Sequence, residues 1–290
     1  MVQETDFNIF ETLLRQESGL VITKEKIYLL ESRLSPIAQK WGIKTLEELA
    51  SKLRVNTDKE LIRDVVEAMT TNETSFFRDN KPFDNLKGVI LPHLKKARDT
   101  KKTIRIWSAA CSSGQEPYSI AMILKELEPQ FPGWKFEITA TDISLDILDQ
   151  AKKGVYTQFE VQRGLPIQFL VKHFEQQGEK WHLKQDLKDM ITFKKANLLE
   201  PLSYLGKFDV IFCRNVLIYF DVETKGKVLH EMQNVLEEDG TLLLGGAETV
   251  LGITEDFKPM PGHKGLYVKQ QSTEDMFYTN TAPTSVLQPA

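Results

Sequence analysis

Residues 208–221 read FDVIFCRNVLIYFD, and this stretch decides the fold. Its first six residues, 208–213, are nearly all apolar, as expected of a strand in a parallel sheet that is buried on both faces. Arg214, Asn215 and Tyr219 follow, at the strand end where open α/β sheets bind ligands. Each also has a structural alternative: a loop salt bridge for Arg214, a turn-capping amide for Asn215 and a core ring for Tyr219.

Working outward, four further short strands alternate with helices. The predicted strands cover 104–107, 136–141, 191–193 and 240–244; the predicted helices begin near Glu116 and cover 144–153 and 222–236. Such alternation predicts a parallel sheet with helical crossovers. The pieces 258–260 and 265–269 fit a closing hairpin across Pro261, Gly262 and His263. We therefore predict an α/β domain over residues 81–270.

The remaining segments differ in texture from this alternation. In residues 1–80 apolar side chains recur at helical spacing, which predicts an all-helical, slightly acidic domain. A helix at 82–97 links it to the sheet. Residues 271–290 are polar and aperiodic, and are predicted to be a flexible tail.

One stretch, from about 155 to 190, interrupts the alternation between the second and third strands. It contains a possible helix at 167–174 and an alternating, exposed strand at 181–183. We predict a small antiparallel β-subdomain inserted here.

Composition excludes several classes of protein. The 290 residues are 41% hydrophobic with a net charge of −4, which indicates a folded chain and argues against nucleic-acid binding. No apolar run reaches the about 20 residues of a membrane helix, and the N-terminus has no signal-peptide pattern. Two cysteines suit a reducing cytoplasm. We expect a cytoplasmic protein without direct membrane insertion.

Two features of the first half of the sheet indicate a nucleoside site. The loop at 109–117 reads AACSSGQEP, and its small residues let a ligand approach the backbone at a helix N-terminus. It lacks the G-x-G-x-x-G pattern, and a tight turn with Pro117 at the first helical position would also explain it. Asp142 ends the next strand, where an acid can bind ribose hydroxyls. Its alternative is capping the next helix, a role that Ser144 could equally fill.

The segment between the helical and sheet domains is unusual for a plain linker. Residues 69–79 read MTTNETSFFRD, with hydroxyls, an amide, two aromatic rings and an arginine. The plain alternative is a helix start capped by Thr70 or Thr71.

Taken in order, five motifs resemble the chemotaxis receptor glutamate methyltransferases of the CheR type. They are TNETSFFR (71–78), SAACSSGQEPYSI (108–120), ATDIS (140–144), ANLLE (196–200) and FDVIFCRNVLIYFD (208–221). The resemblance covers about residues 5–270. It implies an α/β fold, a Rossmann-like class I methyltransferase sheet with an N-terminal all-helical domain and the β-subdomain insertion. It also implies S-adenosylmethionine as cofactor and glutamates of chemoreceptor cytoplasmic helices as substrate.

The resemblance further implies two sets of site residues. We expect no metal, since the sequence has neither a C-x-x-C pair nor an H-E-x-x-H motif. The cofactor-binding set is Asn72, Thr74, Arg78, Glu116, Asp142, Asn197, Leu198, Cys213 and Arg214. Around the transferring methyl group the family would place Arg78, Arg214 and Tyr219. A glutamate carboxylate is ionised at neutral pH, so the reaction needs positioning rather than a general base. We therefore expect Arg78 and Tyr219 to orient the reactants.

Two other classes of function remain at this point. One is a methyltransferase of the same fold acting on a small molecule or RNA; acidity argues against RNA, and the helical domain is superfluous for a small substrate. The other is a non-enzymatic cofactor sensor, which the intact Arg78, Asp142, Arg214 and Tyr219 disfavour.

Two further expectations concern the receptor. Some family members bind a C-terminal receptor pentapeptide through a longer, glycine-bearing loop of the β-subdomain. Here only residues 175–180 precede the predicted strand, so we expect no such tether. We also expect a monomer. The basic residues Lys24, Lys26, Arg33 and Lys40 form either a docking face for an acidic helix or an ordinary solvated face.

Overall fold

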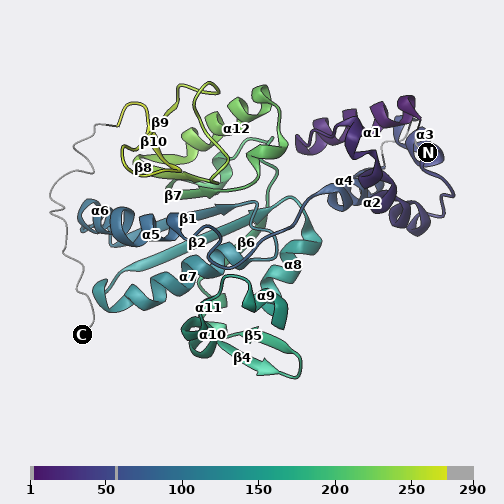
Figure 1. Ribbon diagram of the computed structural model, residues 1–290. Helices are drawn as coiled ribbons and strands as arrows, with labels where there is room; N and C mark the ends of the chain where they lie inside the picture. The colour runs from purple at the N-terminus through teal and green to yellow at the C-terminus, as the bar shows by residue number, and fades with distance from the viewer. Residues whose placement is uncertain (1–2, 56–57, 273–290) are drawn as a thin grey trace.

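The computed structural model describes residues 3–55 and 58–272 (Figure 1). The predicted tail lies outside the described residues except for 271 and 272. The N-terminal part is all-helical, as predicted, with its own core. Its elements are α1 (Glu4–Ser18), the 3₁₀ turn η1 (Lys24–Lys26), α2 (Ile27–Lys40), α3 (Leu46–Val55) and α4 (Lys59–Met69). None of the described helices is long and apolar enough to cross a membrane.

Beside this helical domain lies a mixed sheet of seven strands (Figure 1). The strands are β1 (Thr103–Ala109), β2 (Lys135–Asp142), β6 (Ile191–Lys195), β7 (Phe208–Cys213), β8 (Leu236–Leu244), β9 (Phe257–Pro259) and β10 (Leu266–Lys269). Their order across the sheet is β6-β2-β1-β7-β8-β10-β9. The first five are parallel, and β10 and β9 form the predicted antiparallel hairpin. The predicted α/β fold is confirmed.

The strand order creates a topological switch point at β1. From β1 the chain moves outward to β2 and then β6, and it returns to the other side of β1 as β7. Ile106 accordingly faces Ile138 of β2 on one side and Val210 of β7 on the other. Crossovers that leave a strand in opposite directions open a crevice at its carboxyl end.

Alternating side chains of the central strands supply two cores, one on each face of the sheet. Ile104 and Ile106 point into the core covered by α5 (Lys81–Asn85), α6 (Leu91–Ala97) and α7 (Gln115–Leu127). Trp107 points into the opposite core, which α12 (Val222–Val235) covers. Between α5 and α6 the helix predicted at 82–97 contains a π-helical turn, η2 (Leu86–Ile90).

The insertion is a three-stranded antiparallel sheet, as predicted, but its details differ. Its elements are β3 (Val155–Thr157), α9 (Gln158–Gln162), α10 (Ile167–His173), β4 (Phe174–Gln177), β5 (Lys180–Leu183) and α11 (Gln185–Lys188). Residues 175–180, predicted as a loop, are mostly strand: β4 and β5 pair directly. Only Gly178 and Glu179 turn the chain, and Gly178 has the left-handed φ of +62° that such hairpin turns use.

Two other boundaries were wrong. Pro117 is the third residue of α7, not the first, because Gly114 ends the loop and the helix begins at Gln115; proline is still tolerated in a first turn. Leu236 begins β8 rather than ending a helix, since it pairs with Phe208 across a bulge in the ladder.

An ion-pair cluster fixes the amino-terminal end of β7, far from the crevice. The buried Asp209 accepts a hydrogen bond from Arg98 Nε at 2.7 Å and another from the Arg105 backbone N–H at 2.7 Å. Arg98 also donates to Asp239 at 2.9 Å, after the start of β8. The cluster therefore joins α6 to β1, β7 and β8.

Candidate functional site

A cleft lies at the carboxyl ends of β1, β2 and β7. The space inside it, open solvent included, is about 1030 Å³. Nine of the predicted site residues line it: Asn72, Thr74, Arg78, Glu116, Asp142, Asn197, Leu198, Arg214 and Tyr219. Segments far apart in the sequence thus meet at the switch point.

The loop between β1 and α7 is held tightly against the end of β2. The Cys111 N–H donates to the Thr141 carbonyl at 2.8 Å, and the Ser112 N–H donates to Asp142 Oδ2 at 2.9 Å. Gly114 turns the chain into α7 with φ +94°, and a Cβ there would come within 3.0 Å of a neighbouring ring. The loop is a tight turn and also lines the cleft.

Asp142 is a buried acid at the edge of the cleft. It is 6% exposed and accepts hydrogen bonds from the backbone N–H groups of Ser112 and Ser144 at 2.9 and 3.1 Å. Burial raises the pKa of its carboxyl above the ordinary value, against the lowering effect of these hydrogen bonds. Ser144, whose Oγ accepts from the Ile147 N–H, is the cap of α8 (Leu145–Lys153). Asp142 is therefore not needed as a helix cap.

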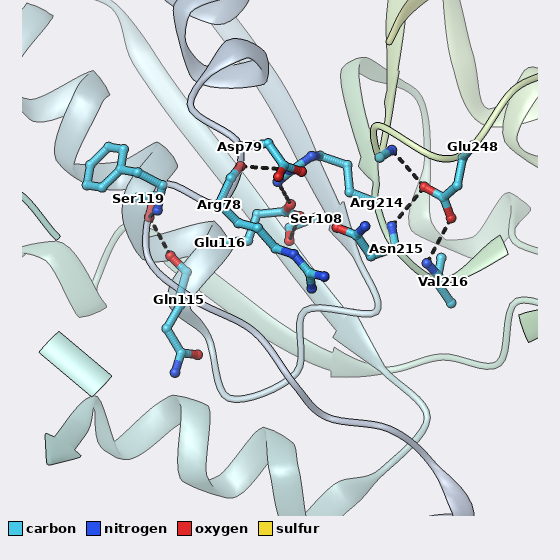
Figure 2. A network of polar contacts seen from close by, with 12 residues as sticks. Arg78, Asp79, Ser108, Gln115, Glu116, Ser119, Arg214, Asn215, Val216 and Glu248 are labelled. Atoms are coloured by element: carbon cyan, nitrogen blue, oxygen red, sulfur yellow. Dashed lines mark hydrogen bonds and ion pairs between the residues drawn. The ribbon is translucent and has the colours of Figure 1, made fainter. Parts of the chain in front are cut away.

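Arg214 joins three segments around the cleft (Figure 2). Its Nη1 donates to Glu116 Oε2 at 2.9 Å, and its Nη2 donates to Asp79 Oδ2 and to the Arg78 carbonyl, each at 2.7 Å. Ser108 Oγ holds the other oxygen of Glu116 at 2.8 Å. The Arg214 side chain is 1% exposed. Its charge is paired with the carboxylates of Glu116 and Asp79.

Arg78 differs from Arg214 although the two are adjacent. Figure 2 shows their guanidinium groups pointing in different directions. Arg78 is half-buried, lines the cleft and donates through Nη1 to the Glu73 carbonyl at 3.1 Å. Within the described chain its other N–H groups have no hydrogen bond. Arg78 is therefore the arginine that can bind an anionic group in the cleft.

The helical domain closes one end of the cleft. Ser18 and Leu20, at and after the end of α1, line it. Asn197 Nδ2 donates to the Glu17 carbonyl at 2.8 Å, and the Val21 N–H donates to the Tyr219 carbonyl at 2.9 Å. Residues of both domains therefore form the site.

Backbone strain gathers at this cleft. Of the non-glycine residues with positive φ in the described ranges, all but Lys102 lie in the interdomain segment or in the loops after β1 and β7. They are Phe77, Asp79, Asn80, Ala110, Ser112 and Asn215. Each such conformation costs free energy and persists only where the surroundings enforce it, a pattern typical of functional sites.

Two sequence-based interpretations need correction. Cys213 does not line the cleft: its side chain is fully buried in the core on the α12 face, because alternation along β7 turns it there. Neither Thr70 nor Thr71 caps a helix start. Thr70 follows the last residue of α4, and the next helix begins only at Lys81.

Three of the four basic residues of the helical domain, Lys24, Arg33 and Lys40, already have partners within that domain. Arg33 donates to the carbonyls of Met69 and Thr70 at 2.9 and 3.0 Å, at the end of α4. Lys40 pairs with the buried Asp64 at 2.6 Å, and Lys24 pairs with a glutamate of α1. Arg33 and Lys40 stabilise the helical domain itself.

Sequence reasoning missed Asp79 and Glu248. Asp79 lies next to Arg78 and pairs with Arg214, a contact that spans 135 residues and has no local signal. Glu248 follows the end of β8 and binds the backbone of the loop after β7. The rule that ligands lie beyond strand ends, applied to β8 as it was to β7, would have found it.

Two family models together match most of the chain. The all-alpha domain of CheR methyltransferases matches residues 5–70, and their SAM binding domain matches residues 72–266. A chemotaxis protein methyltransferase of Vibrio anguillarum is 40% identical over 271 residues, which cover 92% of this chain and 98% of that protein. Chemotaxis protein methyltransferase 1 of Pseudomonas aeruginosa is 40% identical, over 90% of this chain and 96% of its own.

Solved structures are more distant. The glycopeptide N-methyltransferase MtfA in complex with S-adenosylmethionine is 13% identical, with a TM-score of 0.36, over 67% of this chain and 59% of that one. At this TM-score the two structures are too different for their sites to be compared.

We expect Asp142→Asn to weaken binding of S-adenosylhomocysteine about tenfold to a hundredfold at neutral pH, because hydrogen bonds to a charged group are lost. In the predicted role of Asp142, ribose hydroxyls would donate to its ionised carboxylate. The affinity of the unmodified protein should therefore fall as the pH falls through the raised pKa of Asp142, and the variant should lose this dependence. Calorimetry in a pH series that runs downward from neutrality measures both.

Asp149→Asn, which changes an exposed acid of α8, is the matched control. Its affinity should equal that of the unmodified protein. An unchanged affinity in Asp142→Asn would contradict the assigned role.

Proposed function

The chain belongs to the family of CheR chemotaxis methyltransferases, which use S-adenosylmethionine, and from that premise we propose that it methylates glutamate side chains of chemoreceptor cytoplasmic helices. The product is a glutamate methyl ester, and the enzyme acts as a cytoplasmic monomer. One observation carries this proposal. The same cleft holds a buried acid, Asp142, and an arginine, Arg78, whose other N–H groups make no hydrogen bond within the described chain.

The described residues fit the cofactor. Asp142 offers a carboxylate acceptor for ribose hydroxyls, and Glu116 presents a carboxylate to the cleft for the ammonium of the amino-acid part. Asn197 and Leu198 line the cleft, and the family resemblance assigns them to the adenine. When bound, the cofactor supplies a methyl group on a sulfonium centre.

The chain's own residues have to position a carboxylate. A glutamate is ionised at neutral pH, so its oxygen attacks the methyl carbon without losing a proton. Arg78 can hold that carboxylate by charge-assisted hydrogen bonds, and the Tyr219 hydroxyl can orient it. Because two acids already pair with Arg214, its role is to hold Glu116 and the 78–79 segment in place. The reaction is then accelerated by alignment of the reacting atoms.

The function is tested by transfer of labelled methyl groups to a chemoreceptor cytoplasmic domain. We expect the label to be released as methanol by mild base, since esters hydrolyse and N-methyl groups do not. The rate should be flat through neutral pH, because the nucleophile is already ionised. Base-stable label, or a rate rising tenfold per pH unit through neutrality, would overturn the proposal.

Replacing Arg78 tests the proposed carboxylate-binding residue. Arg78→Gln should reduce transfer about tenfold to a hundredfold, since it removes a charged hydrogen-bonding group. Arg78→Lys should recover part of the rate, because it keeps the charge but loses the planar fork.

The matched control is Arg163→Gln, which removes an exposed arginine that pairs with Glu73 of the same segment. Surface pairs contribute little, so its rate should stay within about twofold of the unmodified enzyme. Equal losses in Arg78→Gln and Arg163→Gln would assign the effect to general charge rather than to binding in the cleft.

We also propose that the enzyme reaches the receptor without a peptide tether. Only two residues, Gly178 and Glu179, connect β4 to β5, which leaves no extended loop to surround a peptide. Calorimetry with a peptide of the receptor's C-terminus should show no binding at micromolar concentration. A micromolar dissociation constant would sink this proposal.

A further inference from the structure

Glu248 places a carboxylate among backbone N–H groups from two strand ends. Its Oε2 accepts from the Asn215 N–H at 2.8 Å and from the Gly245 N–H at 2.6 Å. Its Oε1 accepts from the Val216 N–H at 3.0 Å and from the Ile218 N–H at 3.3 Å. Figure 2 shows Glu248 reaching across to this loop. The residue is 8% exposed, and no cation of the described chain forms an ion pair with it.

The loop that Glu248 holds carries part of the cleft wall. Asn215, Val216 and Tyr219 line the cleft. Asn215 has a left-handed φ of +59°, which costs free energy for a residue with a side chain. The hydrogen bonds from Asn215 and Val216 to the carboxylate offset that cost, and so the loop keeps its conformation directly after β7.

The space around the carboxylate is closed. A Cβ at Gly245 would lie 2.7 Å from Glu248 Oε2 and 2.8 Å from Asn215 Nδ2. Both atoms would have to move. The conformation of the loop after β7 therefore depends on one carboxylate in one position, and both of its oxygens accept hydrogen bonds. A glutamine amide would turn an NH₂ group toward N–H donors.

We propose that Glu248 is a positioning residue for methyl transfer: through the backbone of residues 215–218 it fixes the Tyr219 side chain at the cleft. Glu248 itself contacts neither reactant. This role rests on the proposed function, since it concerns transfer to a receptor glutamate.

The test is a double-mutant cycle at 20 °C with a receptor cytoplasmic domain as methyl acceptor. Glu248→Gln should reduce kcat about tenfold to a hundredfold, the scale of a misplaced reacting group. In a Tyr219→Phe background the same change should cost less than about threefold, because the group it positions is gone and the two effects are not additive. A purely structural role would give equal losses in both backgrounds.

Asp209→Asn is the matched control. Asp209 is also a buried carboxylate that accepts a backbone N–H, but it lies at the opposite end of β7. This variant should lower the urea midpoint without lowering kcat per folded molecule. Gly245→Ala is a second route to the same displacement of Glu248, and it should reproduce the loss of kcat.

Additive losses, unchanged kcat in Glu248→Gln, or an equal loss of kcat in Asp209→Asn would each overturn the proposal. Failure of both Glu248→Gln and Gly245→Ala to fold would also overturn it, by making the role structural. An unmodified enzyme that transfers nothing to receptor glutamates would instead refute the proposed function, and with it this role.

Discussion

The pairing of Arg214 with Glu116 and Asp79 is the interaction on which the site depends. Arg214 directly follows β7 at the centre of the sheet, Glu116 lies in the first turn of α7, and Asp79 ends the 69–79 segment. A guanidinium buried to this extent is stable only when its charge is matched. The same requirement therefore holds the three segments at one point.

This arrangement separates two tasks between neighbouring arginines. Arg214 is surrounded by acids and holds the architecture, whereas Arg78 keeps N–H groups directed at the cleft. Residue type alone does not reveal this difference, because both arginines follow apolar segments and both belong to motifs of the family. The difference follows from where Glu116 and Asp79 lie in space.

The fold and most of the cleft were predictable because they follow from local patterns. The apolar run at 208–213, the alternation of strands with helices and the polar residues at strand ends each reflect a rule that acts over a few residues. Cys213 belongs to one of the family motifs, but strand alternation, which is also a local rule, turns its side chain into the core. Ser18 and Leu20 line the cleft through tertiary contacts that no local pattern encodes.

The helical domain contributes Ser18 and Leu20 to the cleft wall. Its backbone also forms hydrogen bonds with Asn197 and Tyr219 of the sheet domain. A gene rearrangement that separated the chain directly after residue 70 would preserve all three hydrophobic cores. It would nonetheless abolish the binding site, because Ser18 and Leu20 would leave with one fragment and Asp142 with the other. The two domains are therefore constrained to be inherited together, although each has the core of an independent folding unit.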